Sequence, residues 1–287
     1  MKIKYNIITM GKVIATDLDG TLFYPKRRVR MIKSKSLKFL RRHIDNGGRL
    51  VLVSGRNIDS AKMVKDKINR PLDAIGCNGS VITINGEIIH DVHFDPEKTL
   101  KALDEIEKEF KIRGFYIMND DCEFIMRNRY KEPLFMTIYR VWNFFQGVYA
   151  TKFIVDKEKY FDGIKNCHAR KIMMFFGITK KDKNRSKEVN KIIRERYPDV
   201  FEASWANEFI ELSPAGCSKS QGLKYYLNYL NIKPSDVYVV GDSGNDISMF
   251  NEFPEKSFCM SHAPLSVSKY AKHVVKHFSD VEKFINK

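Results

Sequence analysis

The sequence has few of the residues that build a disulfide framework or a zinc site. Its 5 cysteines in 287 residues are odd in number and far apart: Cys77, Cys122, Cys167, Cys217 and Cys259. None of them forms a C-x-x-C pair, and no histidine stands at a metal-ligand spacing from one. We therefore expect reduced thiols with mostly structural roles.

Long hydrophobic runs are also missing. No stretch approaches the roughly 20 apolar residues that a membrane-spanning helix needs. The N-terminal stretch Met1–Ile8 is too short and too polar for the core of a signal peptide. A composition that is 43% hydrophobic and 30% charged argues against a disordered or fibrous chain. These features predict a globular, cytoplasmic protein without a membrane partner.

Acidic residues are fewer than basic ones. The chain has 35 Asp and Glu but 50 Lys and Arg, which gives a net charge of +15. Such an excess raises the question of nucleic-acid binding. The basic residues are densest over 26–49, but there Leu37, Leu40 and Ile44 recur at the spacing of an amphipathic helix with a charged outer face. No motif that reads DNA or RNA accompanies them. We therefore favour attraction of anionic small molecules over binding of nucleic acid.

Apolar strands alternate with amphipathic helices near both ends of the chain, which is typical of a parallel α/β sheet. The near-continuous apolar runs suit strands that are buried on both faces. The expected strands are 12–16, 49–53, 73–77 and 236–240, and the expected helices are 34–46, 58–68, 218–230 and 281–287.

In the middle of the chain, the regular alternation of apolar strands and amphipathic helices stops. It begins with a hairpin, in which Asn85-Gly86 supplies a type I′ turn between 81–84 and 87–90. The expected helices here are 96–110, the aromatic-rich segment 130–149 and 182–196, and the expected strands are 115–118, 123–126, 170–178 and 208–212. We predict a doubly wound, Rossmann-like parallel-sheet core from residues 1–91 and 215–287, interrupted by an inserted α+β cap domain over 92–214.

Polar motifs follow three of the expected core strands. The first strand runs into Asp17-Leu18-Asp19-Gly20-Thr21, the second into Ser54-Gly55-Arg56, and the strand 236–240 into Gly241-Asp242-Ser243-Gly244-Asn245-Asp246. In open α/β sheets, ligands bind beyond the carboxyl ends of the strands. Carboxylates packed together there are costly without a cation. The pattern therefore predicts a divalent metal, and Mg²⁺ suits an oxygen-only site.

These residue types match the steps of phosphoryl transfer. Asp17, at the strand end, can attack phosphorus and become an aspartyl phosphate. Asp19 can protonate the leaving group and later deprotonate water. Ser54 and Gly55 can offer a hydroxyl and an amide to the phosphoryl oxygens, close to a helix N-terminus. Asp242 is a natural metal ligand.

Each motif alone has a simpler explanation. D-x-D-G-T can be a turn with an Asx cap, and Ser54-Gly55 is ordinary turn chemistry. The segment 241–246 can be a loop, although it lacks the spaced acidic ligands of an EF-hand. All three in this order, each after a buried strand, favour a catalytic site.

Together these motifs resemble the haloacid dehalogenase (HAD) superfamily, and the large late insert resembles its Cof-type subfamily with a class IIB cap. The chain from Lys12 onward fits that layout. The resemblance implies catalytic roles for Asp17, Asp19 and Lys219; phosphate or substrate binding by Leu18, Ser54, Gly55, Asn78, Lys219 and Asn245; Mg²⁺ ligation by Asp17, Asp242 and the main-chain carbonyl of Asp19; and supporting roles for Thr21 and Asp246. The sequence departs from the family pattern at Ser218-Lys219-Ser220, where S-K-G is usual, but the lysine is retained.

The resulting hypothesis is a magnesium-dependent phosphatase of small phosphate monoesters, such as sugar phosphates. A phosphosugar mutase or phosphotransferase would use the same residues and stays open. So does a basic nucleic-acid-binding or regulatory protein with a vestigial site, although the intact aspartates and Lys219 argue against it. An insert of roughly 120 residues over the site implies a small, enclosed metabolite. The physiological substrate and the oligomeric state cannot be read from these residues.

Overall fold

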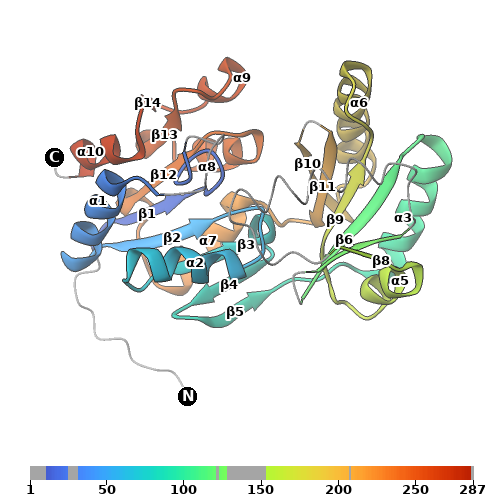
Figure 1. Ribbon diagram of the computed structural model, residues 1–287, viewed down its shortest axis with the longest axis horizontal. Helices are drawn as coiled ribbons and strands as arrows, with labels where there is room; N and C mark the ends of the chain where they lie inside the picture. The colour runs from blue at the N-terminus through green and yellow to red at the C-terminus, as the bar shows by residue number, and fades with distance from the viewer. Residues whose placement is uncertain (1–10, 25–31, 121–122, 128–152, 207, 286–287) are drawn as a thin grey trace.

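Two β-sheets organise the chain in the computed structural model (Figure 1). The structure describes residues 11–24, 32–120, 123–127, 153–206 and 208–285. The helix expected over 130–149, Cys122 and the N-terminal stretch Met1–Ile8 lie outside these residues.

The larger sheet, called the core sheet, has the strand order β14-β13-β12-β1-β2-β3-β4-β5. Neighbouring strands from β14 to β3 pair in parallel, and β4 and β5 are added antiparallel. The bounds are β1 Val13–Thr16, β2 Arg49–Val53, β3 Asp73–Gly76, β4 Val81–Ile84, β5 Glu87–Asp91, β12 Val237–Gly241, β13 Ser257–Met260 and β14 His273–Val275.

Helices cover both faces of the core sheet because the strands are apolar on both faces. Ile14, Leu50 and Leu52 pack with α1 (Ser34–Asp45) and α2 (Asp59–Ile68). The alternate residues of these strands, Ala15 and Val51 among them, pack against the opposite layer. That layer contains α7 (Lys219–Tyr229), α8 (Ile247–Glu252) and α9 (Leu265–Ser268), and the chain ends in α10 (Glu282–Ile285). The chain winds from β1 toward β3 and later from β12 toward β14, which confirms the doubly wound parallel sheet.

The smaller sheet, called the insert sheet, has the order β10-β11-β9-β6-β7-β8. Its strands are β6 Gly114–Asn119, β7 Phe124–Met126, β8 Phe153–Val155, β9 Ala169–Phe175, β10 Phe201–Ala206 and β11 Phe209–Pro214. Its helices are α3 Pro96–Glu109, α5 Lys157–Lys165 and α6 Lys180–Arg196. They pack on one face of the sheet, on the side away from the core sheet in Figure 1. The α+β insert therefore has its own apolar core.

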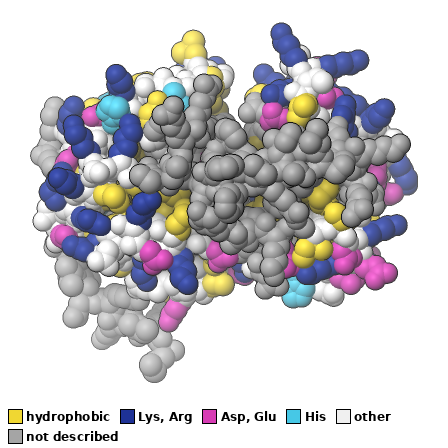
Figure 2. All heavy atoms as spheres, in the orientation of Figure 1, with side chains coloured by type: hydrophobic (Ala, Val, Ile, Leu, Met, Phe, Trp, Pro, Cys, Tyr) yellow, Lys and Arg dark blue, Asp and Glu magenta, His cyan; other side chains and the backbone are white. Residues whose placement is uncertain are grey.

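The membrane-spanning potential, the cysteines and the surface charges of the described residues can each be compared with the expectations from the sequence. Among the described residues, no helix is both long enough and apolar enough to cross a membrane. The four described cysteines are free, and three of them are buried. Figure 2 shows Lys and Arg spread over both halves of the visible face, interleaved with acidic and apolar side chains.

Gly79 is expected to be essential for the packing of α7 against the turn η1 (Cys77–Gly79). Its φ is +109°, and an added Cβ would collide with the main-chain carbonyl of Ser218, the N-cap of α7. Gly79→Ala should lower the free energy of unfolding by about 2–5 kcal/mol, through strain at positive φ and through the clash. Gly86 is the matched control, because its φ is +91° and nothing lies within 4 Å of an added Cβ. Gly86→Ala should cost only about 1 kcal/mol, and equal losses in urea unfolding would refute the proposed clash.

Candidate active site

Three neighbouring parallel strands bring the predicted motifs to one edge of the core sheet. β1 lies between β12 and β2, and Thr16 is in register with Val240 and Leu52. The segments that follow these strands therefore leave the sheet at the same edge. The amide of Asp17 extends the pairing by donating to the carbonyl of Val240 at 2.9 Å.

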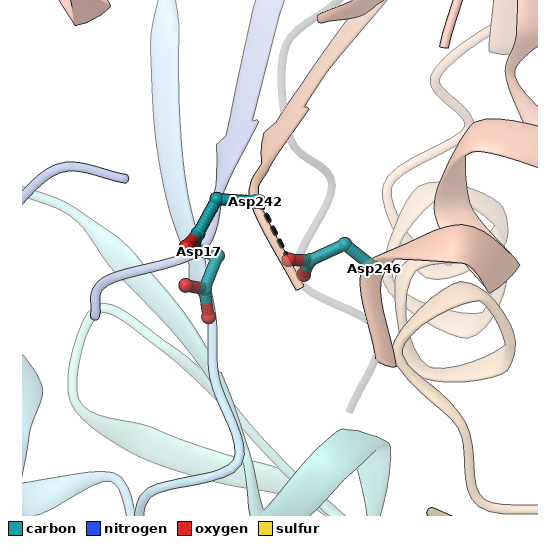
Figure 3. A group of neighbouring side chains, drawn as sticks. All are labelled: Asp17, Asp242 and Asp246. Atoms are coloured by element: carbon teal, nitrogen blue, oxygen red, sulfur yellow. Dashed lines mark hydrogen bonds between the residues drawn. The ribbon is translucent and has the colours of Figure 1, made fainter. Parts of the chain in front are cut away.

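Carboxylates from two of these segments form the centre of the site. One ligand oxygen each from Asp17, Asp242 and Asp246 lies within 4.8 Å of the other two, and all three side chains are buried. Figure 3 shows the carboxylates of Asp17 and Asp242 next to each other at the strand ends, while Asp246 approaches from the turn η3 (Gly244–Asp246). The expected convergence of carboxylates is present, but the side chain of Asp19 is not part of this group.

Lys219 neutralises part of this charge. It stands in the first turn of α7, where the hydroxyl of Ser218 caps the helix by accepting from the amide of Gln221. Its ammonium group has no solvent exposure and donates to Asp17 Oδ1 and to Asp246 Oδ1, both at 2.6 Å. The structure therefore places Lys219, one of the 50 Lys and Arg residues of the chain, beside the carboxylates of the site.

Burial is the largest influence on the pKa of both partners. It raises the pKa of Asp17 to about 8, because Lys219 only partly offsets the desolvation of the carboxylate. Burial alone would lower the pKa of Lys219, but Asp17 and Asp246 outweigh it and hold that pKa above its usual range. Lys219 therefore carries a positive charge at neutral pH.

The donor set fits a hard divalent cation. Only the single ammonium of Lys219 faces these three buried carboxyl groups, and the raised pKa of Asp17 means that a further cation is needed to hold Asp17 as the carboxylate at neutral pH. Asp246 is already committed, since its Oδ2 accepts from the amides of Asp242 and Ser243 at 2.9 and 2.8 Å. Asp17 and Asp242, which follow the ends of β1 and β12, are the ligands that we expect for the metal, and such oxygen donors suit Mg²⁺.

Two neighbours hold the carboxylate of Asp242. Thr21 donates its hydroxyl to Oδ1 at 2.9 Å, and His262 Nε2 lies 3.1 Å from Oδ2. The ring of Tyr24 stacks on His262 with centroids 4.4 Å apart. Sequence reasoning anticipated a supporting place for Thr21 and missed His262, which no motif marks.

Three of the predicted phosphate-binding residues are joined by hydrogen bonds. The carbonyl of Ser54 accepts from the amide of Asn78 at 3.0 Å, and Asn78 Oδ1 accepts from Asn245 Nδ2 at 3.2 Å. Leu18 is buried, and its carbonyl accepts from the amides of Thr21 and Phe23 in the turn after β1. Ser54, Asn78 and Asn245 are thus brought together from three separate motifs.

Asp19 has a different environment from Asp17. Its side chain is 39% exposed and is held by two hydrogen bonds from Arg56, Nε to Oδ2 at 2.5 Å and Nη2 to Oδ1 at 3.0 Å. Arg56 belongs to the Ser54-Gly55-Arg56 motif, but sequence reasoning gave it no role. The adjacent Gly55 accepts through its carbonyl from Lys171 of the insert sheet at 3.0 Å, another contact without a sequence signal.

The family model of haloacid dehalogenase-like hydrolases matches residues 14–285. The chain therefore belongs to this family. The match confirms the family and the class of enzyme that its motifs predicted, a hydrolase of the haloacid dehalogenase type.

Individual relatives match along most of the chain. The 5-amino-6-(5-phospho-D-ribitylamino)uracil phosphatase YwtE of Bacillus subtilis is 25% identical, over 83% of this chain and 84% of its own. The pyridoxal phosphate phosphatase YbhA of Escherichia coli is 25% identical, over 92% and 93%. A haloalkanoate-superfamily phosphatase structure from Bacteroides thetaiotaomicron superposes with a TM-score of 0.75 at 20% identity, over 99% of this chain and 97% of that chain. This structural likeness confirms the predicted fold class, while the roles of individual residues and the domain boundaries stay predictions.

Proposed function

We propose that this hydrolase is a magnesium-dependent phosphatase of small phosphate monoesters that works through a phosphorylated aspartate, Asp17. The observation that carries the proposal is the contact of Asp17 with the buried Lys219, beside the second buried carboxylate of Asp242. Among the described residues, Asp17 Oδ2 has no hydrogen-bond partner, so one oxygen of this carboxylate is available to attack phosphorus.

In the first step, a carboxylate oxygen of Asp17 forms a bond to phosphorus while the bond from phosphorus to the ester oxygen breaks. Asp19, protonated and released from its ion pair with Arg56, gives its proton to the departing alkoxide. Lys219 holds Asp17 in position and offsets the charge of the phosphoryl oxygens. In this proposal, Ser54, Gly55 and Asn245 hold those oxygens.

In the second step, Asp19 takes a proton from a water molecule that attacks phosphorus, which releases inorganic phosphate and restores Asp17. Asp17, Asp242 and the main-chain carbonyl of Asp19 would hold Mg²⁺, which supplies positive charge to the phosphate group when it is bound. The other residues of the site need only orient the two carboxylates and the phosphate.

Residues 92–214 are proposed as the cap that encloses the leaving group and excludes water. The two curated relatives named above act, by their names, on phosphate esters of small metabolites. A small phosphorylated metabolite is accordingly the proposed substrate class. Release of free inorganic phosphate separates this activity from a mutase, which would return the phosphoryl group to a second hydroxyl.

Metal removal tests the proposal directly. Hydrolysis of 4-nitrophenyl phosphate should disappear with excess chelator and return with Mg²⁺, because the buried carboxylates repel the phosphate unless a cation offsets their charge. Ca²⁺ should inhibit, because its higher coordination number lets it take both oxygens of Asp17. Nitrophenolate absorbance gives the rate, and the Asp17→Asn protein gives the background. Full activity in excess chelator would rule out the magnesium-dependent mechanism.

A further inference from the structure

A fourth strand of the core sheet ends at the edge where the candidate site lies. β13 pairs in parallel with β12, so the turn after β13 leaves the sheet beside Asp242, which follows β12. On either side of His262 in this turn, the amides of Ser261 and Ala263 donate to main-chain carbonyls at 2.9 and 3.0 Å. The backbone that carries His262 is therefore held in place by the fold itself.

From this position the ring of His262 contacts the carboxylate of Asp242. The two side chains are 26% and 2% exposed, and Nε2 of the ring lies 3.1 Å from Oδ2 of the carboxylate. A carboxylate that binds a metal is ionised and can only accept hydrogen bonds, so Nε2 is the donor of this contact. His262 does not belong to the group of described residues whose ligand atoms gather at the candidate metal site. It therefore contacts an expected metal ligand rather than the metal.

The segment that follows β1 acts on both oxygens of Asp242. Thr21 donates its hydroxyl directly to Oδ1 at 2.9 Å. Tyr24 acts on Oδ2 through His262, because the two rings are stacked with centroids 4.4 Å apart and planes 14° apart. Tyr24 in turn packs against the apolar core beneath α1, and the ammonium of Lys33 lies 5.3 Å from the centre of its ring. The stack limits rotation of the imidazole and so keeps Nε2 directed at the carboxylate.

This arrangement bears on the metal because two carboxylates from different strands must be oriented toward it at once. A side chain that is free to rotate loses that freedom when the metal binds, which weakens binding, whereas a side chain already held by neighbours avoids the loss. Partners that orient metal ligands in this way typically contribute about 10- to 100-fold to metal affinity or activity. A purely structural hydrogen bond would stabilise the metal-free protein but leave its metal affinity unchanged.

We infer that His262 is a positioning residue of the metal site, which holds the carboxylate of Asp242 in the orientation that binds Mg²⁺, and that Tyr24 holds the ring of His262. The inference rests on the proposed function, because it takes Asp242 as a metal ligand. Removal of the histidine donor should therefore weaken metal binding although every expected ligand is retained.

Calorimetric titration of the metal-free protein with Mg²⁺ measures this affinity without turnover. His262→Phe keeps a ring that can stack on Tyr24 but removes the donor, and it should raise the Kd for Mg²⁺ about tenfold. His262→Gln keeps a donor nitrogen but loses the ring, and its Kd should stay within about threefold of the unmodified protein. In turnover of 4-nitrophenyl phosphate, the half-saturating Mg²⁺ concentration of His262→Phe should also rise about tenfold, while kcat at saturating Mg²⁺ should change less than about threefold.

Tyr24→Leu tests the second part of the inference. Loss of the stack should raise the Kd for Mg²⁺ about threefold when His262 is present, and it should have no further effect in the His262→Phe protein, because no donor is left to position. An equal effect of Tyr24→Leu in both backgrounds would show that Tyr24 does not act through His262.

His273 supplies the matched control. Its ring stacks on Phe258 with centroids 4.8 Å apart, but it lies in β14, outside the candidate site. His273→Phe should leave the Mg²⁺ affinity unchanged. Urea unfolding of each metal-free variant checks that the protein is folded, so that a loss of affinity can be assigned to the metal site.

The outcomes separate this inference from the proposed function. Unchanged Mg²⁺ affinity of His262→Phe would make the histidine a structural contact and overturn the inference. Equal weakening in His262→Phe and His262→Gln would also overturn it, because the site would then need the imidazole itself rather than a donor to Asp242. In both cases Mg²⁺-dependent hydrolysis of the aryl ester would persist and the proposed function would stand. An unmodified protein that binds no Mg²⁺ would remove the magnesium-dependent function together with the inference.

Discussion

Asp17→Asn is expected to abolish turnover and covalent labelling together, with a loss of at least about 10⁴-fold in kcat. An amide is too poor a nucleophile to form the acyl phosphate. The substitution keeps the size of the side chain, and the amide oxygen can still accept from Lys219, which contacts Asp17 Oδ1 in the protein. The fold should therefore survive while the chemistry is lost.

Rapid quenching followed by mass spectrometry locates the phosphate in this experiment. The unmodified protein should carry it on Asp17, and the Asp17→Asn protein should carry none at that position. Asp45→Asn is the matched control, because Asp45 lies on the surface and pairs with Arg70; it should label and turn over normally. Phosphate trapped on Ser54, or full activity of Asp17→Asn, would mean that the nucleophile is a different residue.

The core of the fold could be predicted from the sequence because its strands are buried on both faces. Near-continuous apolar runs bounded by turn residues are typical of strands buried on both faces. The expected strand 49–53 matches β2, Arg49–Val53, and the expected strand 12–16 differs from β1, Val13–Thr16, by one residue. The hairpin also agrees, since Asn85 and Gly86 both have positive φ.

Elements of the insert were harder to predict because their signals are weak. β10 was not expected: its buried positions include the small Ala203, and Trp205 is partly exposed. α5 was missed as well, although Asp156 caps it by accepting from the amide of Lys159. Such short elements form through tertiary packing rather than through local preference.

The same contrast applies to the candidate site. Asp17, Ser54 and Asp242 could be predicted to converge, because each follows a strand and parallel strands end at one edge. His262 and Lys171 could not, because they contact these segments from distant parts of the chain and belong to no recognisable motif. Gly55 and Lys171, for example, are 116 residues apart in the chain. Only the folded geometry identifies such partners.

Asp19→Asn is expected to slow hydrolysis of alkyl phosphates by about a hundred- to ten-thousandfold, because it removes both the proton donor of the first step and the base of the second. The nucleophile Asp17 remains. A nitrophenolate leaving group needs little protonation, so the first step should survive with the aryl ester. Hydrolysis of the intermediate should then stall, and phosphoenzyme should accumulate on Asp17.

Arg56→Met separates this effect from loss of the ion pair with Arg56. It removes both hydrogen bonds to Asp19 but leaves the carboxylate in place. The pair is partly exposed, with side-chain exposures of 26% and 39%, so its loss should change stability by no more than about 1 kcal/mol. If Asp19 transfers the protons, phosphoenzyme should accumulate in Asp19→Asn and not in Arg56→Met. Similar accumulation of phosphoenzyme in both variants would show that the ion pair itself matters to the second step. If Asp19→Asn lost activity equally on alkyl and aryl esters, Asp19 would not be the acid that protonates the leaving group.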